Sequence, residues 1–137
     1  MRFEILGKPQ GKGRPRFYKG IVYTDHTTAR YERTVKNTFK QQYPKFEPFT
    51  SEIRVCIKAV FEVPKSYSKK RRESLLSSRT GYTHKPDADN ISKIILDSLN
   101  GLAYVDDSQV TTLLIYKEYG QENKVIVDIE EIVWFIT

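Results

Sequence analysis

The stretch KPDADNISKIILDSLNG occupies residues 85–101 and organises the rest of the chain. Apolar side chains recur with helical spacing through it and just beyond it, at Ile91, Ile94, Ile95, Leu99 and Leu102. This spacing predicts a helix that begins near Asp89 or Asn90 and stops at Asn100–Gly101, since glycine after a helical pattern is a strong stop signal. One side of the helix is expected in the core, and the helix anchors an acidic segment at its start.

Patterns on either side of this helix predict a mixed arrangement of strands and helices. An apolar residue at every fourth position from Tyr31 to Phe39 indicates a helix over 28–42, and the β-branched and aromatic run 53–63 is typical of a long strand. The remaining segments predict a hairpin at 17–23, a short helix within 67–79, and strands at residues 1–6, 107 or 110 to 119, 124–129 and 133–136. The fold class is α/β of the α+β type, a single domain over 1–137 with a small mixed β-sheet and two or three helices.

The composition is that of a globular protein and not of a disordered chain. Of the 137 residues, 39% are hydrophobic and 12% aromatic, which is enough for one compact core. No apolar run approaches the roughly 20 residues that a membrane helix needs, and the first residues begin a strand-like pattern instead of a signal sequence. We therefore expect a cytoplasmic protein with no membrane partner. The single cysteine, Cys56, excludes an internal disulfide.

Charge is divided unevenly along the chain. Residues 1–85 contain 20 Lys or Arg and 7 Asp or Glu, whereas residues 86–137 contain 3 and 10, and the net charge is +6. A basic surface attracts a polyanion such as DNA, and a local acidic pocket would repel that polyanion unless it holds a metal ion. The basic loop 7–16 is expected to be flexible, and the run Lys69–Arg72 is expected to contact phosphates. The alternative is that these charges are ordinary solvated faces.

Four carboxylates gather around the predicted helix. Asp87 and Asp89 lie at its start, and Asp106 and Asp107 follow the chain reversal at Gly101. Like charges this close oppose each other's ionisation unless a cation lies between them, and hard oxygen ligands favour Mg²⁺, with Mn²⁺ as a substitute, over zinc. In a strand that begins at the later pair, alternation lets only one of the two carboxylates face the site. The alternative for the first pair is helix N-capping, for which aspartate is favoured.

Lys93 is a further candidate within this helix. It lies four residues after Asp89 and four before Asp97, so the three side chains share one helix face. This spacing is typical of two helical ion pairs, worth about 0.3–0.5 kcal/mol each. It equally suits a fixed cation that neutralises the charge developing on a phosphate during hydrolysis. The spacing leaves both roles open.

The order and spacing of these motifs resemble the RusA family of endodeoxyribonucleases, the Holliday-junction resolvases of phages and prophages. The likeness rests on KPDADN (85–90), Lys93, DSLNG (97–101) and YVDDSQV (104–110), and extends to GRPR (13–16) and Tyr23–Thr24. The resemblance implies a homodimer, intertwined or tightly packed, of mixed α/β subunits. It also implies binding of four-way DNA junctions and magnesium-dependent nicking of two opposed strands, with no small-molecule cofactor. The segment 65–79 adds length and charge that a minimal member would lack.

The resemblance also assigns roles to individual residues. It makes Asp87, Asp89 and Asp107 the metal-binding and catalytic aspartates, disfavours Asp106, and makes Lys93 the catalytic lysine. Contacts with DNA phosphates are expected from Lys12, Arg14, Arg16, Lys69, Lys70, Arg71, Arg72 and Lys85. The leading hypothesis is a metal-dependent, structure-selective DNA endonuclease that resolves Holliday junctions by paired phosphodiester hydrolysis during recombination and repair. The alternatives are a nuclease of the same chemistry that acts on flaps or forks, and a non-catalytic DNA-binding recombination accessory protein.

Overall fold

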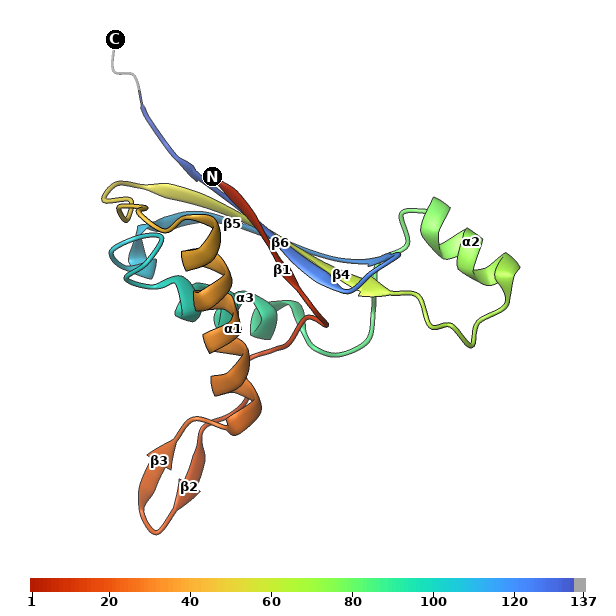
Figure 1. Cartoon of the computed structure of the whole chain (residues 1–137), viewed down its shortest axis with the longest axis horizontal. Coiled ribbons are helices and arrows are strands. Elements are labelled where there is room, and N and C mark those ends of the chain that lie inside the picture. The colour runs from red at the N-terminus through yellow and green to blue at the C-terminus, as the bar shows by residue number, and fades with distance from the viewer. Residues whose placement is uncertain (135–137) are drawn as a thin grey trace.

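A four-stranded mixed β-sheet lies at the centre of the computed structural model, which describes residues 1–134 (Figure 1). Its strands follow the spatial order β1 (Arg2–Leu6), β6 (Lys124–Glu131), β4 (Ile53–Glu62) and β5 (Val110–Gly120). β6 pairs antiparallel with both β1 and β4, whereas β4 and β5 are parallel. Because parallel neighbours cannot be joined by a tight turn, a long crossover connects β4 to β5. This crossover contains α2 (Lys69–Ser77) and α3 (Ala88–Leu99).

The helices α1 (His26–Gln42) and α3 pack against one face of the sheet and enclose the hydrophobic core with it. Alternation along β4 points Val55, Ile57 and Ala59 into this core, where their neighbours across the ladder on β6 are also buried. α3 adds four large buried side chains at helical spacing, Ile91, Ile94, Ile95 and Leu99. The acidic segment therefore lies at the start of a helix that the core holds in place.

Two segments project from the core (Figure 1). The first is a hairpin of β2 (Arg16–Tyr18) and β3 (Ile21–Tyr23), all of whose strand residues are exposed. Lys19 and Gly20 form its turn with positive φ angles of 49° and 79°, as a tight two-residue hairpin loop requires. The second is the arm that carries α2, a helix with no buried residue, whose N-terminus is capped by Ser68.

The predicted α+β fold class is confirmed. Within residues 1–134, the chain forms three α-helices, one mixed four-stranded sheet and one two-stranded hairpin. Of the two starts predicted for β5, Val110 is confirmed, because residues 107–109 form a 3₁₀ helix instead of strand. The strand predicted at 133–136 is absent from Val133 and Trp134, and its remainder lies outside the described residues. In the part of the chain that the structure describes, no helix has the length and apolarity needed to cross a bilayer.

The basic loop has no regular structure over residues 7–15, as predicted, and Arg16 already belongs to β2. The loop was expected to be flexible, but hydrogen bonds join it to both helices of the core. The Lys12 amide donates to the Asn90 carbonyl on α3, and the Gly13 amide donates to Thr28 Oγ1 on α1, each at 2.9 Å. A Cβ atom at Gly11 would lie 2.9 Å from Pro86 Cβ, so glycine allows the loop to pass directly over the acidic segment.

Candidate functional site

The first acidic pair lies at the N-terminus of α3. Asp87 is the N-cap residue: its carbonyl accepts a hydrogen bond from the Ile91 amide at 3.0 Å, but its side chain makes no capping hydrogen bond. Asp89 follows in the first helical turn, where the helix dipole favours a negative charge. Both residues are exposed. The capping role that competed with metal binding is therefore not taken by the Asp87 carboxylate.

The second acidic pair lies at a single turn of 3₁₀ helix, η1 (Asp107–Gln109), directly before β5. The Asp106 carboxylate caps this turn by accepting from the Ser108 amide at 3.2 Å, and Gln109 Oε1 accepts from the Asp106 amide at 2.8 Å. Hydrogen bonds from Ser108 lower the pKa of Asp106. Asp107 is exposed and takes no part in this capping box. Asp106 thus caps η1, whereas Asp107 does not. We expected the alternation of a strand to distinguish the two carboxylates, but neither residue lies in a strand.

A buried tyrosine connects the second acidic pair to α3. Tyr104 is fully buried, and its hydroxyl donates to the Leu96 carbonyl at 2.5 Å. Burial raises the pKa of Tyr104 well above its usual range, and the negative charges of Asp107, Asp97 and Asp106 raise it further. Because Tyr104 precedes η1 by three residues, its hydrogen bond to Leu96 holds the start of η1 beside the C-terminal half of α3.

Lys93 is exposed on α3, and no ion pair within residues 1–134 involves it. Asp97, one of its two predicted partners, instead lies 3.2 Å from the Lys12 ammonium. The helical ion pairs that the spacing allowed are therefore not formed. With respect to the described residues, the Lys93 ammonium is a free cation one helical turn from Asp89.

Lys12 clamps the basic loop to both helices, a role that sequence reasoning missed. Its ammonium also binds Glu32 of α1 at 2.9 Å, in addition to Asp97 of α3. Burial lowers the pKa of Lys12, but hydrogen bonds and charges from Glu32 and Asp97 outweigh burial, so the pKa is raised. No local pattern links three residues so far apart in the sequence. The DNA contact expected of Lys12 stays a prediction.

The other basic residues near the acidic segment are more open. Arg14 and Lys85 are exposed, and Lys85 precedes Asp87 by two residues. Arg16 is also exposed but forms an ion pair with Asp25 at 2.9 Å, at the base of the hairpin. None of these three cations is buried, and Lys85 lines a hollow together with Asp87 at the start of α3.

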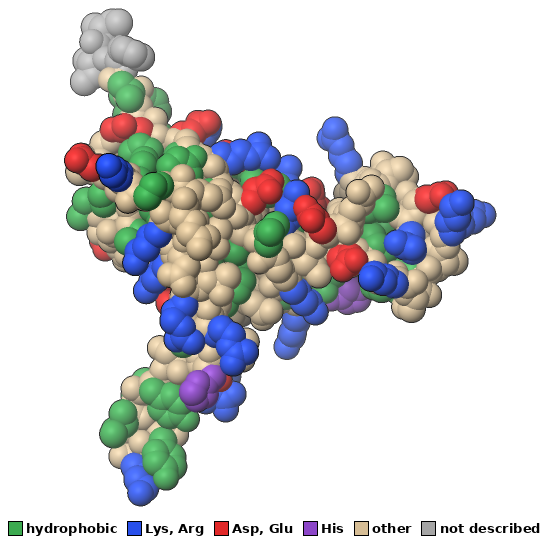
Figure 2. Space-filling view, in the orientation of Figure 1, with side chains coloured by type: hydrophobic (Ala, Val, Ile, Leu, Met, Phe, Trp, Pro, Cys, Tyr) green, Lys and Arg blue, Asp and Glu red, His purple; other side chains and the backbone are tan. Residues whose placement is uncertain are grey.

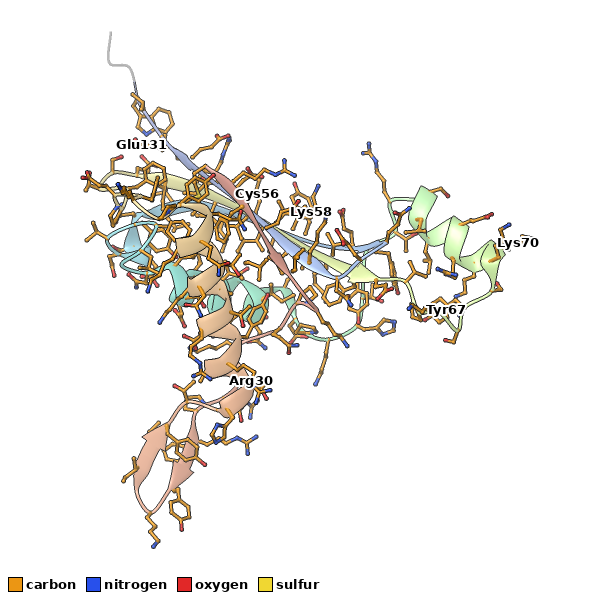
Figure 3. The ribbon with its side chains drawn as sticks, in the orientation of Figure 1. Arg30, Cys56, Lys58, Tyr67, Lys70 and Glu131 are labelled. Atoms are coloured by element: carbon orange, nitrogen blue, oxygen red, sulfur yellow. The ribbon has the colours of Figure 1, made fainter. Side chains whose placement is uncertain are left out.

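The run Lys69–Arg72 occupies the first turn of α2, on the arm at the right of Figure 1. All four side chains are exposed, and Figure 2 shows Lys and Arg side chains over this arm and near the base of the hairpin. Lys70 lies at the far end of the arm, and Tyr67 lies at the turn that leads to it (Figure 3). The Arg71 guanidinium stacks 3.7 Å from the centroid of the Tyr67 ring. Positive charge is thus present on the far side of α3 from the hairpin.

The fit of the acidic residues to a metal ion depends on how closely their carboxylates gather. Among residues 1–134, no three or more His, Cys, Asp or Glu side chains lie close enough together to hold one. Asp87, Asp89 and Asp107 thus form no ready three-carboxylate cluster. Magnesium commonly binds only one or two protein carboxylates, and water and substrate phosphates complete its shell. The oxygen donors of Asp87 and Asp89 fit that chemistry.

A hollow of about 350 Å³ adjoins the first of these carboxylates, Asp87. Asp87, Lys85 and Asn90 line one side of it, and the basic loop lines the other from Lys8 to Lys12. Carboxylate, amide and ammonium groups therefore meet in one open depression. This arrangement can hold a phosphate group near the Asp87 carboxylate if a divalent cation balances its charge.

The chain is similar over nearly its whole length to a known family and to a relative from Bacillus subtilis (strain 168). A family model described as Endodeoxyribonuclease RusA matches residues 7–130, a span that includes the basic loop and both acidic pairs. The chain is also 34% identical over 137 residues to "Uncharacterized protein YqaN" of Bacillus subtilis (strain 168), and the match covers 96% of each chain. The family match extends over most of the fold as well as its acidic site. The chain belongs to the RusA family of endodeoxyribonucleases.

Proposed function

We propose that the protein is a metal-dependent, structure-selective endonuclease that resolves Holliday junctions by paired phosphodiester hydrolysis during recombination and repair. Membership of the RusA family supports action on DNA as an endonuclease. The observation that carries the proposal is the arrangement on α3 of two exposed carboxylates, Asp87 and Asp89, with Lys93. No carboxylate in residues 1–134 neutralises the Lys93 ammonium, so this cation is available to a phosphate.

In this proposal, Asp87 and Asp89 would hold magnesium, for which manganese can substitute. Asp107 would join them on binding of the ion, since the three carboxylates form no ready cluster within residues 1–134. When bound, the ion supplies Lewis-acid polarisation of the phosphate and a more acidic water. Lys93 neutralises the negative charge that builds up on the phosphate in the transition state. Asp106 is left out because its carboxylate already caps η1. The site uses no small-molecule cofactor.

The proposed DNA surface extends from the acidic segment along both projections. Arg14, Arg16 and Lys85 contact phosphates near the cleaved bond, and Lys69–Arg72 contact a duplex flank. These contacts contribute affinity that falls with salt, and they carry no sequence preference of their own. Lys12 acts there mainly by holding the loop to α1 and α3. We further propose a cytoplasmic location, because a nuclease that acts on junctions must reach DNA.

The proposed active form is a homodimer. A four-way junction has strands related by two-fold symmetry, and a two-fold dimer supplies two matching sites for paired cuts. The hairpin β2–β3 supports such an assembly, because Phe17, Tyr18, Ile21 and Val22 are each more than half exposed. A two-stranded ribbon is at best marginally stable in water by itself, so these side chains gain from being covered.

The sharpest test is Asp89→Asn in the full-length protein. Binding of a synthetic four-way junction should persist, while cleavage in magnesium should fall at least about 100-fold, because the substitution removes one charged ligand and leaves the shape unchanged. Gel-shift and strand-nicking assays measure the two separately. Asp107→Asn should behave alike, with Asp106→Asn as the matched control that keeps cleavage within about threefold of the parent protein. Cleavage retained by Asp89→Asn would overturn the assignment.

A substrate panel separates the alternatives. Four-way junctions, flaps, forks and linear duplex should be compared in magnesium, and junctions should be cut fastest and in opposed strands. Faster cutting of flaps or forks would make the protein a nuclease with another preferred DNA structure. The absence of nicking on every branched substrate would leave a non-catalytic DNA-binding role.

A further inference from the structure

A second hollow, of about 270 Å³, adjoins the one beside Asp87. Lys8 lines both hollows, so they share a wall. His84, which also lines the second hollow, is three residues before Asp87. A ligand bound at the acidic segment would therefore lie next to this second hollow. None of the roles proposed above uses it.

Aromatic rings held by the core form much of this hollow. Tyr82 stacks on the buried Phe61 with ring centroids 3.7 Å apart and an interplanar angle of 3°. His84 and Tyr119 each meet the Tyr82 ring edge to face at 5.3 Å. The Tyr82 amide donates to the Lys117 carbonyl on β5 at 3.0 Å. These contacts fix the position of Tyr82 before any ligand arrives.

Tyr67 supplies a second aromatic wall from the turn that leads into the α2 arm (Figure 3). Its ring is half-buried, and Arg71 stacks on it at 3.7 Å. The Tyr67 amide donates to the Pro64 carbonyl at 3.2 Å, which holds the turn against the end of β4. The hollow thus lies between the rigid sheet and the basic arm.

Charged and hydrogen-bonding groups also line the hollow, among them one acidic residue, Glu62. Lys8 and Lys65 contribute ammonium groups, and Asn123 contributes an amide whose Oδ1 accepts from the Glu62 backbone at 2.8 Å. Flat aromatic walls bind the face of a base, and cations near the opening bind the phosphates on either side of it. The combination suits a nucleotide within a DNA strand better than an apolar side chain, which would gain nothing from the ammonium groups.

We propose that this hollow receives an unpaired base of the DNA strand whose phosphate lies at Asp87. The proposal rests on the proposed function, since it takes a branched DNA as the ligand. Extruding a base from a stack costs least where pairing is already disturbed, as at a branch point. Stacking on an aromatic side chain offsets that cost. The hollow would therefore favour branched DNA over intact duplex and connect cleavage to the shape of the substrate.

The experiment uses full-length Asp89→Asn, so that binding is measured without cleavage. Four-way junctions carry 2-aminopurine at successive positions next to the branch in the cut strand, and fluorescence is recorded on binding. One position should change its emission strongly. Adding Tyr67→Ala should remove that change and weaken binding about 5-fold to 150-fold, whereas Tyr67→Phe should retain both. Tyr116→Ala, on exposed sheet surface outside the hollow, is the matched control and should alter neither.

An abasic site at the responsive position gives the decisive comparison. Tyr67→Ala should cost little affinity on the abasic junction, because the base that stacks on the ring is missing. An equal loss on both junctions, or no responsive position, would overturn the inference while leaving junction cleavage by the parent protein intact. A parent protein that cleaves no branched DNA would instead overturn the proposed function. If Tyr67→Ala changes the mass of the protein in solution, the hollow binds a second copy and not a base.

Discussion

The helices α2 and α3 follow each other in the same crossover between β4 and β5, yet they are anchored in opposite ways. α3 buries six residues and carries the first acidic pair at its start, whereas α2 buries none and carries four consecutive cations. Carboxylates that act on one phosphate need fixed positions, and packed helices provide them. Contacts with a polyanion tolerate movement, because attraction to many phosphates depends little on exact geometry. The proposed cleavage of DNA thus belongs to the packed helix α3, and the proposed binding of a DNA flank belongs to the exposed helix α2.

The largest expected effect is on the free energy of unfolding, and it appears when the same leucine-to-alanine substitution is made in each helix. Leu99→Ala in α3 should lower the free energy of unfolding by about 2–5 kcal/mol, because it leaves a cavity in the core. Leu76→Ala in α2, where the side chain is 39% exposed, should change it by no more than about 0.5 kcal/mol. Urea unfolding followed by circular dichroism measures both. Equal losses would mean that α2 contributes to the core after all.

The next comparison concerns the cations of the two helices. Lys93→Ala should lower the cleavage rate at saturating protein about 100-fold, with little change in junction affinity, because it removes charge only from the transition state. Lys93→Arg is the control that keeps the charge. Replacing Lys69–Arg72 together with glutamine should leave that rate unchanged and make the dependence of log affinity on log salt shallower by up to about 3.6. If the quadruple variant cleaved more slowly but kept the salt dependence of its affinity, Lys69–Arg72 would act in cleavage instead of in DNA binding.

The smallest effect concerns the two helix caps. Ser68→Ala removes the hydrogen bond that its hydroxyl accepts from the Arg71 amide, so α2 should lose about 1 kcal/mol of local stability. Asp87→Ala removes no capping hydrogen bond, and α3 should keep its protection while cleavage is lost. Amide hydrogen exchange resolves the two helices. Loss of protection throughout α3 in Asp87→Ala would make Asp87 a structural cap.

Much of the fold could be predicted because the patterns that specify it are local. The four-residue spacing from Tyr31 to Phe39 and the β-branched run 53–63 predicted α1 and β4 to within a few residues. Gly101, with a φ of 82°, ends α3 where the pattern predicted a stop. Helix periods, turns and caps depend on residues close together in the chain, so one sequence suffices to find them.

The candidate site could be predicted only in part. Its acidic residues were found from their spacing, but their roles depend on neighbours that spacing does not reveal. The choice of Asp107 over Asp106 came from a family resemblance, whereas the structure offers a physical distinction in the capping box of η1. The aromatic hollow was not predicted, because Tyr67, Tyr82 and Tyr119 meet only after β5 pairs with β4.

By itself, the sequence determined where strands and helices form, where acidic and basic residues cluster along the chain, and which family motifs are present. Only the tertiary structure decided that β5 runs parallel beside β4 and that a hollow adjoins Asp87. It also decided that Lys12 binds Asp97, whereas Lys93 forms no ion pair among residues 1–134. The physical reason is the range of the interactions. Backbone periodicity and capping act over a few residues, whereas ion pairs and cavities require residues that are distant in the chain to meet, and many pairings satisfy the same side-chain chemistry.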